Sequence, residues 1–257
     1  MELLNKYYQK VKSILGLSFS LAKAKFKLRN EGSYLGIFWY LLNPLMLFFI
    51  LSSINHITNK NPIENYHLYL LMGLIMFNFF RQATTVSAGA IKGGAGLIKS
   101  LKINYEPFVL SGVLQAIFSH FFEILIFIFF YIYFGLPLLW ILYYPLIFCL
   151  FVVFTTGICF ILATIGTFVN DIENAWGIIL NFLWLATPIF YFSDVNFLLN
   201  KVNPIFYFVE IPRSIVIYGR YPDFYKIILP AFVFSVIFLI IGLFIFRRYK
   251  NRFAEAL

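Results

Sequence analysis

The chain has 257 residues, of which 61% are hydrophobic and only 12% are charged, and its mean hydropathy is +0.85. Soluble globular proteins are about 45–50% apolar and about 25% charged, so this composition excludes a soluble enzyme, a nucleic-acid-binding domain and a disordered chain. It predicts an all-α membrane protein that crosses the bilayer several times. The formal net charge of +9 then has a first explanation in topology, because Lys and Arg gather on the cytoplasmic side of membrane proteins.

The amino-terminal part of the chain has an amphipathic pattern. Residues 3–28 carry apolar side chains at helical spacing with lysines between them, which predicts a helix, and residues 1–34 are assigned to a cytoplasmic interface segment. Two placements are open. The helix lies along the membrane with its lysines toward anionic headgroups, or it packs on the protein's own cytoplasmic face.

Six long apolar stretches follow, and each is close to the roughly 20 residues that a helix needs to cross a bilayer. They are residues 35–54, 67–87, 108–134, 141–168, 175–192 and 226–246. An amino terminus in the cytoplasm places fourteen of the twenty basic residues on that side. The sequence therefore predicts six transmembrane helices within a domain of residues 35–257, with both termini cytoplasmic.

The last external segment, residues 193–225, differs from a plain loop. It contains short apolar runs interrupted by Pro204, Pro212, Gly219 and Pro222. These runs are too short to cross a membrane, and they predict short helices that enter the bilayer partway and return. Irregular backbone at that depth is tolerated where it is buried in protein or lines a wet cavity. The segment is therefore a candidate external gate, and the alternative is an interfacial loop.

Three ionisable residues fall inside apolar stretches: Arg81 in the second, and His120 and Glu123 in the third. Such residues usually face the protein interior or water. The favoured interpretation is an Arg81–Glu123 pair that holds two neighbouring helices together, with His120 assisting. The alternative is a polar patch on a translocation path. The two cysteines and three histidines indicate neither a disulfide framework nor a metal site.

Residues 93–100 superficially resemble a phosphate-binding loop. The Walker A pattern requires Gly directly before the Lys, and here Ile98 precedes Lys99. The sequence therefore predicts no nucleotide site and no cofactor in this chain. A membrane-embedded enzyme is also disfavoured, because the cytoplasmic acids Asp171 and Glu173 are two residues apart and do not share a helical face.

Several short motifs, in their order and spacing, resemble those of polysaccharide-export ABC transporter permeases. They are Ser33-Tyr34-Leu35-Gly36-Ile37-Phe38-Trp39 with Pro44, Asp171-Ile172, Pro188-Ile189-Phe190-Tyr191, Asn203-Pro204 with Arg213, Gly219 and Pro222, and Phe246-Arg247-Arg248-Tyr249 with Phe253-Ala254. The resemblance covers nearly the whole chain and is strongest to the permeases of O-antigen. It implies a homodimer around a channel in the bacterial inner membrane. It also implies two separate ATPase subunits that bind ATP and Mg²⁺, and a glycan substrate on a polyprenyl pyrophosphate carrier.

The resemblance also assigns functional segments. The cytoplasmic loop of about residues 95–107 would couple to the ATPase through Lys99, Leu101, Asn104, Tyr105 and Glu106. The external gate would include Asn203, Pro204, Arg213 and Gly219. The substrate path would include Trp39 and Tyr40, with Lys25, Lys27 and Arg29 as nearby cations for a pyrophosphate, and Arg81 and Glu123 within the membrane. Membrane lipids are expected partners and nucleic acid is not. The alternative substrates are teichoic acid, capsule or another lipid-linked molecule.

Overall fold

The computed structural model describes residues 2–31, 38–58, 63–101, 103–192 and 197–257, and all its regular elements there are helices. The long ones are α1 (Glu2–Asn30), α2 (Phe38–Thr58), α3 (Tyr66–Ala88), α6 (Glu106–Tyr133), α7 (Tyr144–Phe168), α8 (Ile172–Ala186) and α11 (Leu229–Tyr249). The short ones are α4 (Ala90–Gly93), α5 (Ala95–Leu101), η1 (Leu138–Tyr143), α9 (Leu198–Val202), α10 (Pro204–Pro212), η2 (Arg213–Ile217), η3 (Phe224–Ile228), η4 (Lys250–Arg252) and α12 (Phe253–Ala256). The prediction of an all-α membrane protein is confirmed.

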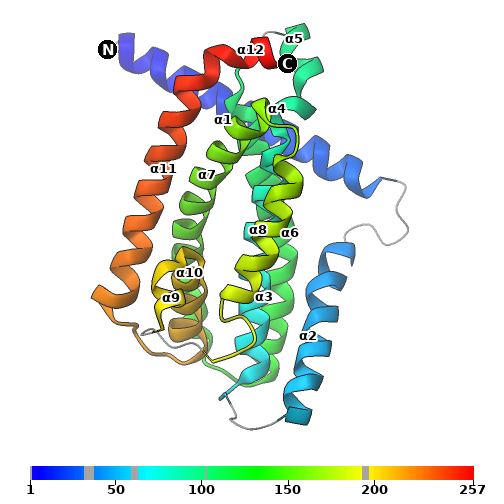
Figure 1. Ribbon diagram of the computed structural model, residues 1–257. Coiled ribbons are helices and arrows are strands. Elements are labelled where there is room, and N and C mark those ends of the chain that lie inside the picture. Colours follow the sequence, from blue (N-terminus) through cyan, green and yellow to red (C-terminus); the bar gives the residue numbers. More distant parts are fainter. Residues whose placement is uncertain (1, 32–37, 59–62, 102, 193–196) are drawn as a thin grey trace.

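The long helices form an upright bundle that α1 crosses at one end (Figure 1). Both chain ends lie at this end, together with α4, α5 and α12, and we call it the α1 end. The short helices α9 and α10 lie toward the other end of the bundle, which we call the α10 end. Helix α2 stands at the side of the bundle, where it contacts α3 and α6. This arrangement agrees with the predicted placement of both termini on one side.

In the part of the chain that the structure describes, three stretches of helix are long and apolar enough to cross a membrane: Glu106–Tyr133, Leu138–Phe168 and Phe224–Ala256. Two shorter apolar helices, Pro44–Asn55 and Ile172–Ala186, accompany them. Helix α3 is 23 residues long but carries polar residues, and most of its side chains are buried by its neighbours. The chain is thus membrane-embedded, whereas the count of six crossings stays a prediction.

Helices α7 and α11 approach each other closely through two glycines. A Cβ at Gly157 would collide with the backbone at Phe238, and a Cβ at Gly242 would collide with the carbonyl of Gly157. Small residues at such contacts let helix backbones pack against each other in a membrane, where van der Waals contact rather than the hydrophobic effect drives association. Ser235 of α11 adds a hydrogen bond of 3.1 Å to the carbonyl of Leu150.

Helix α8 is shorter than the predicted fifth span. The sequence pattern predicts a crossing over residues 175–192, but the helix ends at Ala186, so the second part of that prediction is wrong. The physical reason is Pro188, since the residue before a proline is pushed out of the helical region. Thr187 accordingly has φ −93° and ψ 132°.

The segment before the last long helix contains the predicted short helices. Helix α10 begins directly after Asn203, whose side chain accepts a hydrogen bond from the Ile205 amide and so caps the helix. Phe206, Phe208 and Val209 are fully buried, because α10 lies against α3, α7 and α11. Helix α10 is therefore packed inside the bundle, whereas α9 keeps Leu198 and Val202 exposed.

Helix α1 packs against α6. Phe26 stacks on Phe122 with ring centroids 6.3 Å apart, and Phe19 meets Phe118 edge to face at 5.8 Å. A second apolar stripe on α1 (Tyr8, Val11 and Leu15) stays exposed. Of the two placements left open by the sequence, packing on the protein is therefore observed, and the exposed stripe leaves one face available to lipid.

Candidate functional site

The predicted coupling loop is joined to the carboxy-terminal tail. Lys99 Nζ donates to the backbone carbonyl of Leu257 at 2.7 Å. The Tyr105 ring meets Phe253 edge to face at 5.2 Å. Glu106 Oε1 accepts from Lys250 Nζ at 2.7 Å. Three contacts thus tie residues 99–106 to residues 250–257, and the two segments form one surface at the α1 end.

The predicted coupling loop is only partly helical. Helix α5 ends at Leu101, and α6 begins at Glu106. Asn104 is exposed between them, and the side chain of Leu101 lies outside the described residues. Residues 93–100 form the junction of α4 and α5 rather than a phosphate-binding loop.

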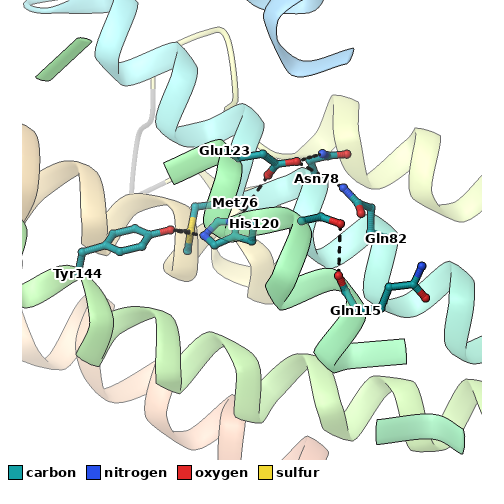
Figure 2. A network of polar contacts seen from close by, with 8 residues as sticks. Met76, Asn78, Gln82, Gln115, His120, Glu123 and Tyr144 are labelled. Atoms are coloured by element: carbon teal, nitrogen blue, oxygen red, sulfur yellow. Dashed lines mark hydrogen bonds and ion pairs between the residues drawn. The ribbon is translucent and has the colours of Figure 1, made fainter. Parts of the chain in front are cut away.

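A buried polar network surrounds Glu123 inside the bundle (Figure 2). Asn78 Nδ2 and Gln82 Nε2 of α3 both donate to Glu123 Oε1 of α6, the second at 3.4 Å. His120 Nδ1 lies 3.5 Å from Glu123 Oε2. On its other side, His120 Nε2 bonds to the Tyr144 hydroxyl at 2.5 Å. The network connects α3, α6 and α7, because each of these helices supplies at least one of its members.

Arg81 does not join this network, so the predicted Arg81–Glu123 pair is wrong. Glu123 takes its hydrogen bonds from Asn78 and Gln82, which lie one turn apart on α3. The Arg81 guanidinium instead lies over the Phe77 ring, 5.3 Å from its centroid. It lines a cavity of about 20 Å³ between α2, α3 and α8, with Asn78 and Trp184. His120 does lie beside Glu123, with Nδ1 3.5 Å from Oε2, but the pair that it was predicted to assist does not form.

The cations predicted near the substrate entrance do not form one patch. Lys25 is half-buried and donates to Ser111 Oγ of α6 at 3.2 Å. Burial lowers the pKa of Lys25 below its ordinary value. Lys27 is exposed and lies 3.6 Å from Glu31. Two residues along a helix point about 200° apart, which explains why the two lysines face opposite sides.

The remaining predicted path residues lie at the start of α2. Trp39 is 59% exposed on the first turn of the helix. The side chains of Tyr40 and Arg29 lie outside the described residues, so their part in the predicted path stays a prediction.

Arg213 is the most extensively bonded residue of the predicted external gate. It is fully buried, and its guanidinium donates to three backbone carbonyls: Nε to Tyr69 at 3.1 Å, Nη1 to Pro188 at 2.6 Å and Nη2 to Ile189 at 2.8 Å. Its Cζ also lies 3.5 Å from the centroid of the Tyr69 ring. We call this arrangement the Arg213 clamp. It joins η2, α3 and the segment that follows α8.

Tyrosines and Asn203 reinforce the same region. The Tyr69 hydroxyl donates to the carbonyl of Tyr191 at 2.8 Å. Tyr218, whose pKa burial raises to about 12, donates to the carbonyl of Glu64 at 3.0 Å. Asn203 Nδ2 donates to Thr187 Oγ1 at 2.8 Å. The segment after α8, whose backbone is not helical, is thus satisfied by side chains from three other elements.

Pro204 and Gly219 have local roles in this region. Pro204 occupies the first turn of α10, where its missing amide hydrogen leaves no helical bond unmade. Gly219 has φ +60° and its Cα faces Trp140, so a residue with a side chain would be strained there. These two predicted gate residues shape the backbone.

Sequence reasoning missed several residues of these sites. Asn78, Gln82 and Tyr144 are neutral polar side chains in apolar stretches. They are not predicted, because the sequence prediction considers only acidic and basic residues within those stretches. Tyr69 and Lys250 become partners only through tertiary contact. Asn78 and Gln82 share one face with four-residue spacing, and this spacing is the one signal that could have indicated them.

Comparison with known proteins assigns the class. Residues 17–217 match the family of ABC-2 type transporters. The chain therefore belongs to the ABC-2 type transporter family, and it is a membrane-embedded transporter subunit.

Relatives of similar length resemble the chain from end to end. Two proteins of Klebsiella pneumoniae, both named O-antigen export system permease protein RfbA, are 28% and 29% identical to it over 96% of this chain and 99% of their own. A Myxococcus xanthus protein of the same name is 23% identical over 94% of this chain and 95% of its own.

Proposed function

We propose that this chain is the membrane subunit of an ATP-driven exporter of lipid-linked polysaccharide of the O-antigen type. The observation that carries the proposal is its similarity, over 94–96% of its length, to three proteins named O-antigen export system permeases. The exporter moves the glycan outward across the bacterial inner membrane, and the α1 end faces the cytoplasm. The basic residues at that end support this orientation.

In this proposal, a separate ATPase binds ATP and Mg²⁺ and docks on the joint surface of α5 and the carboxy-terminal tail. Three contacts join these segments, so a movement of one segment is transmitted to the other and to helices α6 and α11. Lys99, Leu101, Asn104, Tyr105 and Glu106 form the coupling part of this surface. Two copies of the chain and two ATPases make up the transporter.

The substrate passes beside α2, α3 and α8 in the dimer. Trp39 and Tyr40 stand at the cytoplasmic entrance. Of the three predicted cations, Lys27 and Arg29 supply positive charge near it, whereas Lys25 is held by Ser111 of α6. Arg81 lies between α2, α3 and α8, where it can bind an anionic group of the carrier. Glu123 stabilises the path indirectly, because it accepts a hydrogen bond from Asn78, which lines the same cavity as Arg81. At the other end, Asn203, Pro204, Arg213 and Gly219 hold the external gate in place.

The proposal is tested by purifying the chain with its partner ATPase, and by measuring ATP hydrolysis and outward transfer of lipid-linked glycan in proteoliposomes. We expect hydrolysis to be stimulated by lipid-linked O-polysaccharide. Stimulation by teichoic acid or capsule alone would show that the substrate belongs to that class and not to the O-antigens. The absence of any glycan-dependent hydrolysis would overturn the proposal.

Variants of the coupling surface sharpen this test. We expect Tyr105→Ala and Glu106→Ala to reduce glycan transfer by tenfold or more, roughly the effect of about 1.4 kcal/mol, while the chain still inserts. Tyr133→Ala is the matched control, because Tyr133 is an exposed tyrosine at the α10 end of α6, and it should transfer glycan normally. Normal transfer by both coupling variants would contradict the role of this surface.

A further inference from the structure

A groove of about 670 Å³ lies between α1, α6, α7 and α11 at the α1 end. Its walls are apolar and come from Leu110, Phe160, Leu239, Leu243 and Phe246. Its rim is polar and includes Lys10, Arg247 and Lys250, with Glu106. The groove has no part in the proposed glycan path, which lies beside α2, α3 and α8.

The depth of the groove matches one leaflet of a bilayer. Along α11 and η4 its lining runs from Leu239 to Lys250, which corresponds to about 16 Å of helix. Half of the hydrocarbon core of a bilayer is about 15 Å thick. At its deep end the groove reaches Thr156 and Leu239, beside the close contact of Gly157 with α11. The groove can thus hold a chain that starts at the membrane surface and ends near the bilayer centre.

The rim carries surplus positive charge. Lys250 and Glu106 form an ion pair at 2.7 Å and so largely neutralise each other. Lys10 and Arg247 have no ion-pair partner in the part of the chain that the structure describes. Two cations at the mouth of an apolar groove suit a ligand that has an anionic head and an apolar tail.

We propose that this groove binds an anionic phospholipid of the surrounding bilayer. One acyl chain lies against Leu239 and Leu243, and the phosphate of the headgroup lies between Lys10 and Arg247. The bound lipid joins α1 to α11, two helices at opposite ends of the sequence, and so fixes the amino-terminal half of α1 on the bundle.

A phospholipid fits the groove better than the glycan carrier does. Packed helices α7 and α11 close the groove toward the interior of the bundle. A carrier that enters here would have no route for its sugar chain into the protein. A leaflet lipid needs no such route, because its headgroup stays at the membrane surface.

Native mass spectrometry of the purified full-length chain tests the proposal. The chain in neutral detergent is titrated with phosphatidylglycerol and, in parallel, with phosphatidylcholine of the same acyl chains. We expect tighter retention of phosphatidylglycerol. The double variant Lys10→Gln/Arg247→Gln should weaken that retention by roughly 10- to 30-fold, since each basic residue near a lipid surface contributes about 1 kcal/mol.

The matched control is Lys12→Gln/Arg248→Gln, which removes the same charge from two exposed residues outside the groove lining. It should bind phosphatidylglycerol as the unmodified chain does. A second variant, Leu243→Trp, fills the groove while leaving the rim charges in place, and it should also lose the lipid. It keeps the test decisive if the double variant fails to fold.

Three results would overturn the proposal. One is equal retention of the two lipids by the unmodified chain. Another is equal loss of phosphatidylglycerol in the groove and control double variants. The third is displacement of phosphatidylglycerol from the groove by polyprenyl phosphate at equimolar concentration, which would make the carrier the occupant.

Discussion

Arg213 shows how a single side chain can hold an irregular membrane segment in place. The chain leaves the helical conformation after Ala186, and the carbonyls of Pro188 and Ile189, which have no helical partner, need donors from side chains in a medium without water. The planar guanidinium offers five N–H donors in a fixed arrangement, and three of its bonds go to carbonyls of two segments. Lysine lacks this planar geometry.

Gly73 gives a test of the Arg213 clamp. A Cβ at Gly73 would collide with the Arg213 guanidinium, so Gly73→Ala should destabilise the chain by about 1–3 kcal/mol, the range for overpacking a close contact. An ordinary Gly→Ala change within a helix has the opposite sign and stabilises by up to about 1 kcal/mol. Thermal unfolding in detergent measures the difference.

Gly177→Ala is the control for this prediction. Gly177 lies within α8, and a Cβ there would meet no atom within 4 Å. This variant should unfold at the same or a higher temperature than the unmodified chain. Equal stabilisation by both alanine variants would show that the Arg213 clamp does not resist a side chain at Gly73.

Tyr144 tests the buried network around Glu123. Its hydroxyl bonds to His120 Nε2 and lies 3.3 Å from Met76 Sδ. Removing it in Tyr144→Phe leaves a buried imidazole nitrogen without a partner and should destabilise the chain by about 1–3 kcal/mol. Tyr143→Phe removes the neighbouring hydroxyl, whose bond to Tyr221 at 3.4 Å is exposed. Comparable unfolding temperatures for the two variants would contradict a stabilising role for the network.

At the scale of elements, α1 carries two stripes of side chains with different surroundings. One stripe, which includes Ser18 and Ala22, is buried against the bundle, and the other, which is apolar and includes Val11 and Leu15, is exposed. Lys25 lies at the edge of the buried stripe and reaches Ser111. The docking of α1 on α6 therefore places a cation in a partly desolvated position.

This position makes the docking of α1 depend on pH. Burial lowers the pKa of Lys25 in the docked helix, so between the lowered pKa and the ordinary pKa the undocked helix binds more protons. Docking of α1 should therefore strengthen as the pH rises through this window. Below the window Lys25 is charged in both states, so the full free-energy cost of burying that charge opposes docking. Lys25→Met removes the titrating group, so its docking should be independent of pH there.

A spin label attached to Ala24→Cys, in a Cys149→Ser background, reports this docking through the mobility of the label. Cys159 is buried and should not be labelled. We expect mobility to fall as pH rises toward about 10, the ordinary range of lysine. Lys27→Met is the control, because Lys27 is exposed and should leave the pH dependence unchanged. The same pH dependence in Lys25→Met would exclude Lys25 as its source.

At the scale of the whole molecule, α8 is a long helix that this chain leaves largely uncovered. Among its residues Leu180 is buried, whereas Ile178, Phe182 and Leu185 are exposed along one face. The helix has 15 residues and continues into non-helical backbone. Side chains of this chain already satisfy that backbone, so the exposed apolar face of α8 is what a partner could still cover. In the proposed homodimer, in which the glycan passes beside α2, α3 and α8, a second copy should cover this face.

Cysteine cross-linking tests this placement of the proposed homodimer. Phe182→Cys in a Cys149→Ser background should form a cross-linked dimer with a short thiol-reactive linker in membranes. Ile240→Cys is the control, because Ile240 is similarly exposed, on α11, and should remain monomeric on denaturing gels. Cross-linking through position 240 and not through position 182 would place the dimer interface on the opposite side.

The sequence by itself determined the class, the helical segments and the family of this protein. Apolar runs of bilayer length and few charges leave helices as the available backbone structure, and these properties are local to each segment. The predicted third and fourth spans therefore lie within α6 and the η1–α7 stretch. The end of α8 also has a local signal in the sequence, which is Pro188. The predicted span of residues 175–192 follows the length of the apolar run and ignores this proline.

Only the tertiary structure decided which polar groups meet. Arg81 and Glu123 have opposite charges and lie in successive long apolar stretches, yet rotation of α3 about its axis presents Asn78 and Gln82 to Glu123 instead. The same holds for the Arg213 clamp and for the contact of Lys99 with the carboxy-terminal tail. Composition limits the depth of a side chain in the membrane, whereas its partner depends on helix rotation and on contacts between residues far apart in the sequence.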